Sequence, residues 1–240
     1  MGKNLIQQRR GKGTTAFRVP SFRYEGKVKH ISLGKDFEQG VTQGFIKDII
    51  HCQGHSAPLV RVVFGKQETL MIAPEGVHVG YPVFAGRGAA PNTGNTLALS
   101  EIPDGTSIYN IENAPGDGGK LVRTSGSSAK ILSKTKEGVL VMLPSKNKKL
   151  FNPACKACIG VIAGGGRNDK PMLKAGVSFY KNKARNKFYP KVSGLAMNAV
   201  AHPYGGSRSS KLGKVTIAPR FAPPGRKVGL IRPRRTGGKK

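Results

Sequence analysis

The chain has 240 residues, and its 41 Lys and Arg against 12 Asp and Glu give a formal net charge of +29 at pH 7. Such an excess of cations is typical of proteins that bind nucleic acid. Three cysteines, an odd number, exclude a disulfide framework, and the longest aliphatic run, Val139 to Leu143, is too short to span a bilayer. We therefore expect an intracellular protein with no membrane partner and no export signal.

The charge is distributed unevenly along the chain. Residues 1–35 hold 9 Lys and Arg against one acid, residues 36–169 hold 14 against 11, and residues 170–240 hold 18 against none. The nearly balanced middle contains enough Val, Ile, Leu and Phe to bury a core, whereas the ends are rich in Gly, Pro, Lys and Arg. This distribution predicts a folded middle between two basic extensions, and the aromatic residues within those extensions favour binding over a solubility tail.

Residues 1–24 are predicted to form an extended basic arm. Phe17 and Phe22 lie between its cations, so guanidinium groups can fork onto phosphates while the rings stack on unpaired bases. We expect the arm to become ordered only on its partner. Its candidate RNA-binding residues are Arg9, Arg10, Lys12, Arg18 and Arg23.

Residues 25–85 show a pattern of short strands, rich in β-branched and aromatic residues and separated by Gly, Pro, Asp or Asn. Val60, Val62 and Phe64 share one face of their segment, as expected for a half-buried strand. Five such strands predict a small Greek-key barrel of the OB-fold type. The predicted strands are residues 25–31, 44–52, 58–65, 68–73 and 81–85.

Residues 86–95, rich in Gly, Pro and Asn, are predicted to connect this barrel to a second set of short strands over residues 96–169. The second set predicts an SH3-like barrel. The expected fold is therefore mainly β, an OB-fold barrel followed by an SH3-like barrel, with long basic N- and C-terminal extensions. The predicted strands are residues 107–112, 120–124, 128–134, 138–143 and 149–152, and Arg167 near the end of this region is a candidate RNA contact.

Residues 170–240 form the predicted C-terminal extension, whose one helical candidate is residues 170–180. Between Gly194 and Gly206 the glycines and Pro203 break any regular period, yet single Met, Asn, His and Tyr side chains stand between them. This pattern predicts a shaped loop that approaches a polyanion closely. The candidate RNA-binding residues of the extension are Lys183, Arg185, Lys187, Lys191, Met197, Asn198, His202, Tyr204, Gly205, Gly206, Arg208, Arg226, Lys227, Arg232, Arg234 and Arg235.

Two glycine-rich segments favour turns over nucleotide-binding loops. The run from Gly116 to Lys120 resembles part of a phosphate-binding loop, but Ala114 and Leu121 stand where that loop needs glycine and Ser or Thr. The run from Gly164 to Arg167 lacks the strand, helix and acidic partner of a dinucleotide-binding unit. We therefore expect no cofactor.

The cysteines give a weak metal signal. Cys155 and Cys158 have zinc-knuckle spacing, with His51, Cys52 and His55 as further candidate ligands, but no second Cys or His pair follows in the chain. Buried thiols are common structural residues, so we expect no metal site and no catalytic residue.

The segment from Val192 to Arg208 reads VSGLAMNAVAHPYGGSR and resembles the signature of the L2 (uL2) family of large-subunit ribosomal proteins. Residues 1–24 resemble the archaeal branch of that family, and further family segments follow in family order at residues 72–76, 94–97, 115–120 and 222–229. The resemblance implies an OB-fold, an SH3-like barrel, basic extensions threaded into large-subunit rRNA, and a place near the peptidyl transferase centre.

The expected function is therefore that of a non-enzymatic constituent of the cytoplasmic ribosome that binds 23S-type rRNA and supports assembly of the large subunit. Neighbouring large-subunit proteins are implied partners, and contact with the small subunit and the tRNA region is a further possibility. The alternatives are an RNA chaperone or translation factor and, from a different class, an RNA-modifying enzyme. Phosphoryl chemistry needs carboxylates to hold Mg²⁺, and none follows Asp169. We interpret His202 as a hydrogen-bond donor or stacking group toward RNA.

Overall fold

The computed structural model describes residues 3–31, 40–206, 217 and 220–229. The chain forms two compact units, Pro20–Met172 and a second unit of Met1–Val19 with Leu173–Lys240, and each is described by itself. Within the described residues, no helix is long and apolar enough to cross a membrane.

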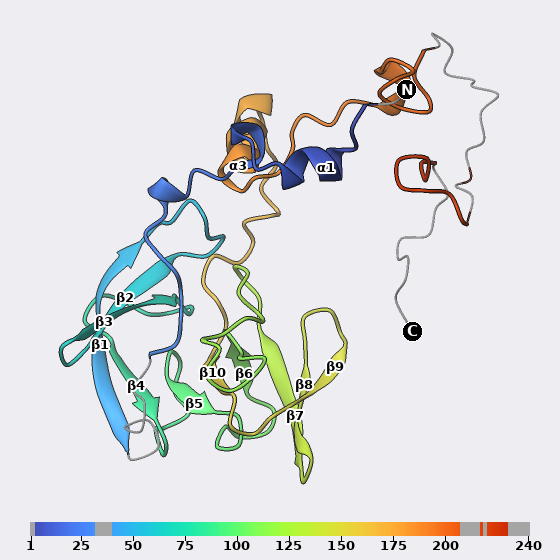
Figure 1. The fold of residues 1–240 in the computed structure, drawn as a ribbon. Coiled ribbons are helices and arrows are strands. Elements are labelled where there is room, and N and C mark those ends of the chain that lie inside the picture. The colour runs from blue at the N-terminus through green and yellow to red at the C-terminus, as the bar shows by residue number, and fades with distance from the viewer. Residues whose placement is uncertain (1–2, 32–39, 207–216, 218–219, 230–240) are drawn as a thin grey trace. The chain divides into compact units, whose positions relative to one another are not determined.

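Residues 20–172 form one ten-stranded sheet with the strand order β3-β2-β1-β4-β5-β10-β6-β7-β8-β9 (Figure 1). All neighbouring strands are antiparallel except β4 and β5, which meet in a single parallel bridge. The chain is thus mainly β, as predicted. The strands are β1 Val41–Ile50, β2 Leu59–Phe64, β3 Gln67–Ile72, β4 Pro82–Gly86, β5 Thr96–Ala98, β6 Ser107–Tyr109, β7 Ala129–Thr135, β8 Gly138–Met142, β9 Lys148–Phe151 and β10 Lys156–Ile159.

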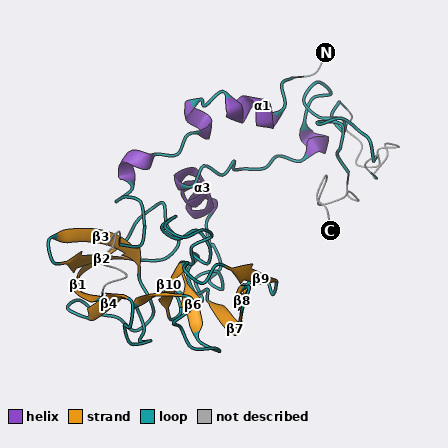
Figure 2. Cartoon of the chain, turned by 60° about the horizontal axis from the view of Figure 1, so that its bottom comes forward, coloured by secondary structure: helices purple, strands orange, loops and turns teal. Residues whose placement is uncertain are grey.

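Two hydrophobic cores lie within this sheet. The first is enclosed mainly by β1–β4 and contains Leu59, Val62 and Ile72, whereas the second contains Leu97, Ile108 and Ile131. Figures 1 and 2 show β1–β4 gathered at one end of the unit and β6–β9 at the other. Tyr109, Cys158 and Ile162 come from the later half of the unit but are buried in the first core, so the two cores are joined.

A strand was expected at residues 25–31, and this prediction is wrong. The side chains of the segment alternate as those of a strand would, with Val28 and His30 buried and Lys27 and Lys29 exposed. Its backbone, however, divides its hydrogen bonds between two partners: the Lys29 N–H donates to the carbonyl of Leu70, and the His30 N–H donates to that of Gly118. No ladder forms because successive residues bond to different segments. We call residues 24–31 the strap.

The other strand predictions for the first core are confirmed within about three residues, at β1 to β4. In the second half, the strand expected at residues 120–124 is wrong, because only an isolated bridge joins Ile111 to Leu121. Val122 follows with a φ of 52°, which turns the backbone out of the extended region. β5 and β10, by contrast, were not predicted. β10 pairs on both sides, with β5 and with β6, and closes the second half of the sheet.

The second unit is poor in regular structure. The helix expected at residues 170–180 is found later, as α3 Ala175–Ala184. The N-terminal arm was expected to be extended, and this is wrong in part: α1 spans Ile6–Gly11 and single 3₁₀ turns span Thr15–Phe17 and Ser21–Arg23, the last lying in the first unit. A third 3₁₀ turn spans Gly194–Ala196.

Candidate nucleic-acid interface

The predicted loop between Gly194 and Gly206 folds back on itself. The carbonyl of Asn198 accepts the N–H groups of Ala201 and His202, and the carbonyl of Met197 accepts the N–H of Gly206 at 3.1 Å. The loop is therefore shaped by its own backbone hydrogen bonds, which satisfy groups that its lack of helix or strand would otherwise leave unpaired.

Two glycines in this loop are required by close approach. A Cβ atom on Gly205 would overlap the carbonyl groups of Met197 and Asn198, and one on Gly194 would overlap the imidazole of His202. Gly205 is buried although the loop around it is largely exposed. In the sequence these two positions were marked only by being glycines. The structure shows that Gly205 makes room for two backbone carbonyl groups and Gly194 for the ring of His202.

The imidazole of His202 is oriented by its neighbour Tyr204. The Tyr204 N–H donates to Nδ1 of His202 at 3.1 Å, and the two rings meet edge-on with centroids 5.3 Å apart. An Nδ1 that accepts a hydrogen bond leaves the proton of the neutral ring on Nε2. His202 is thus arranged to donate from Nε2, which fits the interpretation of this residue as a hydrogen-bond donor.

Aromatic rings in the second unit are covered by cations. The Arg9 guanidinium lies 5.8 Å from the centroid of the Phe17 ring, and Phe17 itself stacks on Phe188 with centroids 6.3 Å apart. Lys183 lies 5.9 Å from the ring of Phe179 on α3. Phe17 is only 8% exposed, so the expectation that its ring stacks on an unpaired base is wrong, whereas Phe179 is 41% exposed and offers a ring and a cation together.

Most of the predicted cations are accessible to a partner. Lys47, Arg61 and Arg87 are held in ion pairs with carboxylates, and none of these three belongs to the predicted set. Arg167 is half-buried and donates from Nε to the hydroxyl of Ser125 at 3.3 Å, while Lys227 donates to the carbonyl of Arg220. The exposed members are Arg9, Arg10, Lys12, Arg18, Arg23, Lys183, Lys187, Lys191 and Arg226, and Arg185 is half-buried. Arg208, Arg232, Arg234 and Arg235 lie outside the described residues.

A cationic pocket in the first unit was missed by the sequence analysis. It has a volume of about 320 Å³, and its lining includes Lys27, Lys29, Lys120 and Arg123 with Asp117 as the one acid. Arg123 ties its walls together by donating to the carbonyls of Gly119 and Val28, both at 3.1 Å. These cations come from segments far apart in the sequence, so no local motif could have revealed them.

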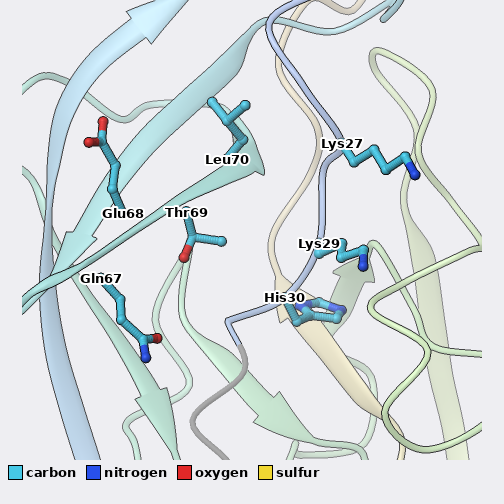
Figure 3. A pocket seen from close by; sticks show the side chains of 7 residues that line it. All are labelled: Lys27, Lys29, His30, Gln67, Glu68, Thr69 and Leu70. Carbon is cyan, nitrogen blue, oxygen red and sulfur yellow. The ribbon is translucent and has the colours of Figure 1, made fainter.

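Lys27 and Lys29 also line a shallow groove of about 450 Å³ between the strap and β3 (Figure 3). In this view both lysines leave the strap on the same side, and the opposite wall is lined by Gln67, Glu68, Thr69 and Leu70, of which Glu68 is the one acid. The two cations therefore stand between two hollows of the surface, where an extended polyanion could reach both.

The turn around Gly116 to Lys120 is not built to cradle a phosphate. Glu112, which is 1% exposed, accepts the N–H groups of Gly116, Gly118 and Lys156, while Asp117 accepts those of Asn113, Ala114 and Gly119. Partial burial alone would raise the pKa of Asp117, but these N–H donors and Lys120 outweigh it and hold the pKa below its usual range. The N–H groups that a phosphate would need are thus already bonded to carboxylates.

The cysteines are buried thiols. Cys158 lies 3.3 Å from the hydroxyl of Thr96 and 3.7 Å from Nδ1 of His30, and burial raises its pKa to about 11. Burial likewise raises the pKa of Cys155. A raised pKa disfavours the thiolate that binds zinc. Within the described part of the chain, no three His, Cys, Asp or Glu residues are grouped as a metal would require.

Residues 92–225 match the family model described as "Ribosomal Proteins L2, C-terminal domain". The chain is 48% identical to large ribosomal subunit protein uL2 of Methanothermobacter thermautotrophicus over 238 residues, which is 99% of both chains. It is also 48% identical over the full length of both chains to the uL2 proteins of Methanococcus maripaludis strain C5 and Methanococcus vannielii.

The chain belongs to the uL2 family. The relatives named above are archaeal, so the resemblance to the archaeal branch is confirmed. The family model covers the loop from Gly194 to Gly206 but ends before Arg226. The match thus includes His202 and the cationic pocket residues Lys120 and Arg123, whereas Lys27 and Lys29 lie in the part covered by the full-length relatives alone.

Proposed function

We propose that this chain is a structural constituent of the large ribosomal subunit that binds large-subunit rRNA, supports subunit assembly and association, and shapes the peptidyl transferase centre. The observation that carries the proposal is the 48% identity to archaeal uL2 proteins over the whole length of both chains. A free RNA chaperone or an RNA-modifying enzyme would have no reason to keep that length and order of segments.

The two hydrophobic cores support the finer assignment of the fold. β1–β4 enclose the first core and β5–β10 supply most of the second, which fits an OB-fold barrel followed by an SH3-like barrel. Both barrels would present cations to rRNA through the pocket around Arg123, while the basic extensions follow the RNA backbone.

The proposed role of the loop around His202 is to present a hydrogen-bond donor to RNA. Its backbone is closed by internal hydrogen bonds, and Nδ1 of His202 is engaged by the Tyr204 N–H. A general base needs a free lone pair within reach of the reacting proton, and here the lone pair of the neutral ring lies on the engaged nitrogen. We therefore assign His202 a shaping role and the protein no enzymatic activity. Contact with tRNA and the small subunit belongs to the same proposal.

Cosedimentation tests the proposal. An integral constituent should remain on purified large subunits at one copy per particle after a wash in about 0.5–1 M salt, because many phosphate contacts must break together. A chaperone, a translation factor or a modifying enzyme should be released or be present in fewer copies. A substoichiometric chain after the wash would contradict the proposal.

A further inference from the structure

The outer face of β1 carries exposed apolar side chains. Val41 is 47% and Phe45 51% exposed, although both lie in a regular strand. In the sheet register, Phe45 stands opposite Val63 on β2 and opposite Pro82 on β4, and directly opposed residues share a face. Pro82 is exposed and Val63 is half-buried. We call Val41, Phe45, Val63 and Pro82 the β1 patch.

The sheet fixes the outward position of Phe45. The next residue, Ile46, is 1% exposed on the inner face, and the preceding Gly44 has no room for a Cβ because the ring of Phe64 lies against it. A shift of one residue in register would place Phe45 inside and Ile46 in solvent. The exposure of the patch is therefore a property of the fold, and exposed apolar surface held in place in this way often marks an interaction site.

The charges beside the patch neutralise one another. Glu68 stands opposite Val63 in the same row, about two strand spacings, or about 10 Å, from Phe45. Arg61 forms ion pairs with Glu68 at 3.0 Å and Glu25 at 3.7 Å, and Lys47 lies 4.0 Å from Glu68. Two cations thus face two carboxylates on a chain with a net charge of +29. A phosphate at Phe45 would therefore meet no net positive charge from these four side chains.

Other exposed rings of the chain differ from Phe45. Phe22 is 83% exposed with Arg23 5.3 Å from its centroid, and Phe221 is 90% exposed with Arg220 at 5.4 Å. Among the described residues, none of the cation–ring contacts involves Phe45. Rings that stack on bases in a polyanion gain from an adjacent cation, and Phe45 has instead a neighbouring ion-paired carboxylate.

We propose that the β1 patch is a docking surface for another protein of the same particle, one that presents apolar side chains to it, and that it does not bind RNA. A neutral, apolar and rigid face has the character of the core of a protein interface, where charged residues are depleted and aromatic residues are enriched. The proposal rests on the proposed function, because the particle supplies the partner.

Site-specific photocrosslinking tests it on the full chain. A benzophenone-bearing amino acid replaces Phe45 in one variant and Phe22 in the matched control, and each is incorporated into large subunits before irradiation. We expect the Phe45 position to crosslink to another protein and the Phe22 position to crosslink to rRNA. A Phe45 crosslink to rRNA, to this chain or to a second copy of it, or no crosslink in particles where Phe22 reacts, would overturn the proposal. Failure of both variants to enter the particle would instead count against the proposed function.

A measurement on the free protein is independent of incorporation. Full-length Phe45→Glu and Phe22→Glu variants are titrated with a large-subunit rRNA fragment. We expect Phe45→Glu to change the RNA affinity less than twofold and Phe22→Glu to lower it severalfold, since of the two rings only Phe22 lies beside Arg23, a predicted RNA-binding cation. A tenfold loss for Phe45→Glu would show that the patch binds RNA and would refute the docking proposal.

Discussion

The two units of this chain differ in the size of their buried core and in the balance of their charges. Residues 20–172 carry 19 Lys and Arg together with all 12 acids, whereas residues 1–19 and 173–240 carry 22 Lys and Arg and no acid. Apart from Phe17, every buried hydrophobic residue of the described chain belongs to the first region. Burial and ion pairs are therefore concentrated in the first region, whereas the second carries 22 cations with no carboxylate of its own to offset them.

The largest expected effect comes from removing the second region. A fragment of Pro20–Met172 should fold but bind rRNA weakly, because it lacks 22 cations. Each phosphate contact contributes roughly 0.7–0.9 to the slope of log K against log salt, so the full chain should show a slope steeper by about 5 or more and an affinity higher by about 10³ at 0.1 M salt. RNA titrations at several salt concentrations measure both quantities. If the fragment is folded by circular dichroism and its salt slope equals that of the full chain, the second region does not carry the RNA binding.

A core substitution should affect only the first region. Ile131 is fully buried in the second core, and Ile131→Ala should lower the free energy of unfolding by about 3 kcal/mol through lost burial and a cavity. The control is Leu173, which is 88% exposed. Leu173→Ala should change the free energy of unfolding by less than about 0.5 kcal/mol. Urea unfolding compares the two variants. Similar losses for both would mean that the second unit contributes folding free energy of its own.

The stability of the first region should fall in acid because of His30. Burial lowers the pKa of His30 to about 4, and its Nε2–H donates to the carbonyl of Asn110 at 2.6 Å. In the unfolded chain the His30 imidazole is protonated near pH 6.5, whereas in the folded chain it stays neutral until about pH 4. Neutral His30 therefore contributes its full share of the free energy of unfolding above pH 6.5. That share is lost as pH falls from 6.5 toward 4, by about 2 kcal/mol at pH 5. His30→Gln should remove this difference between pH 7.5 and pH 5, whereas exposed His78→Gln should retain it. Unfolding by urea at both pH values decides between them.

The smallest effect is expected at His202. His202→Gln keeps an N–H donor and cannot titrate near neutrality, so incorporation into large subunits should stay within about twofold of the parent, while His202→Ala should lose about tenfold, as for one hydrogen bond and its packing. The pH profile of peptide-bond formation should be unchanged in the Gln variant. If the Gln variant were fully incorporated but lost peptidyl transfer together with one pKa in that profile, His202 would be an acid or base in the reaction.

The sequence predicted burial better than it predicted pairing. Val60, Val62 and Phe64 share one buried face, as predicted. In the strap, Val28 and His30 are also buried in alternation, yet the expected strand is absent because its N–H groups donate to Leu70 and Gly118 in turn. β10 carries no such pattern in the sequence. It becomes a strand because the fold places it between β5 and β6, and its small side chains Ala157 and Cys158 gave no strand signal. Local patterns report which side chains are covered, whereas hydrogen-bond partners distant in sequence decide what forms a ladder.

The candidate site divides in the same way. The glycines and the imidazole of the loop could be singled out in advance because a local break in periodicity marks them, and the structure adds the Tyr204 N–H that orients His202. The pocket around Arg123 could not be predicted, because the strap and the turn near Gly119 are some 90 residues apart and meet only in the fold. A count of charges identified the partner class but not this pocket.

Tyr109, Cys158 and Ile162 complete the first core but are synthesised after β1 to β4. β1 to β4 leave the ribosome that makes this chain well before residue 162 does, so their apolar inner faces stay uncovered while some eighty further residues are added. At about 5–20 residues per second, that interval lasts several seconds. During this interval the nascent N-terminal half of this highly basic chain is most open to aggregation or to capture by a chaperone. The interval ends when Ile162 is added and the first core can close.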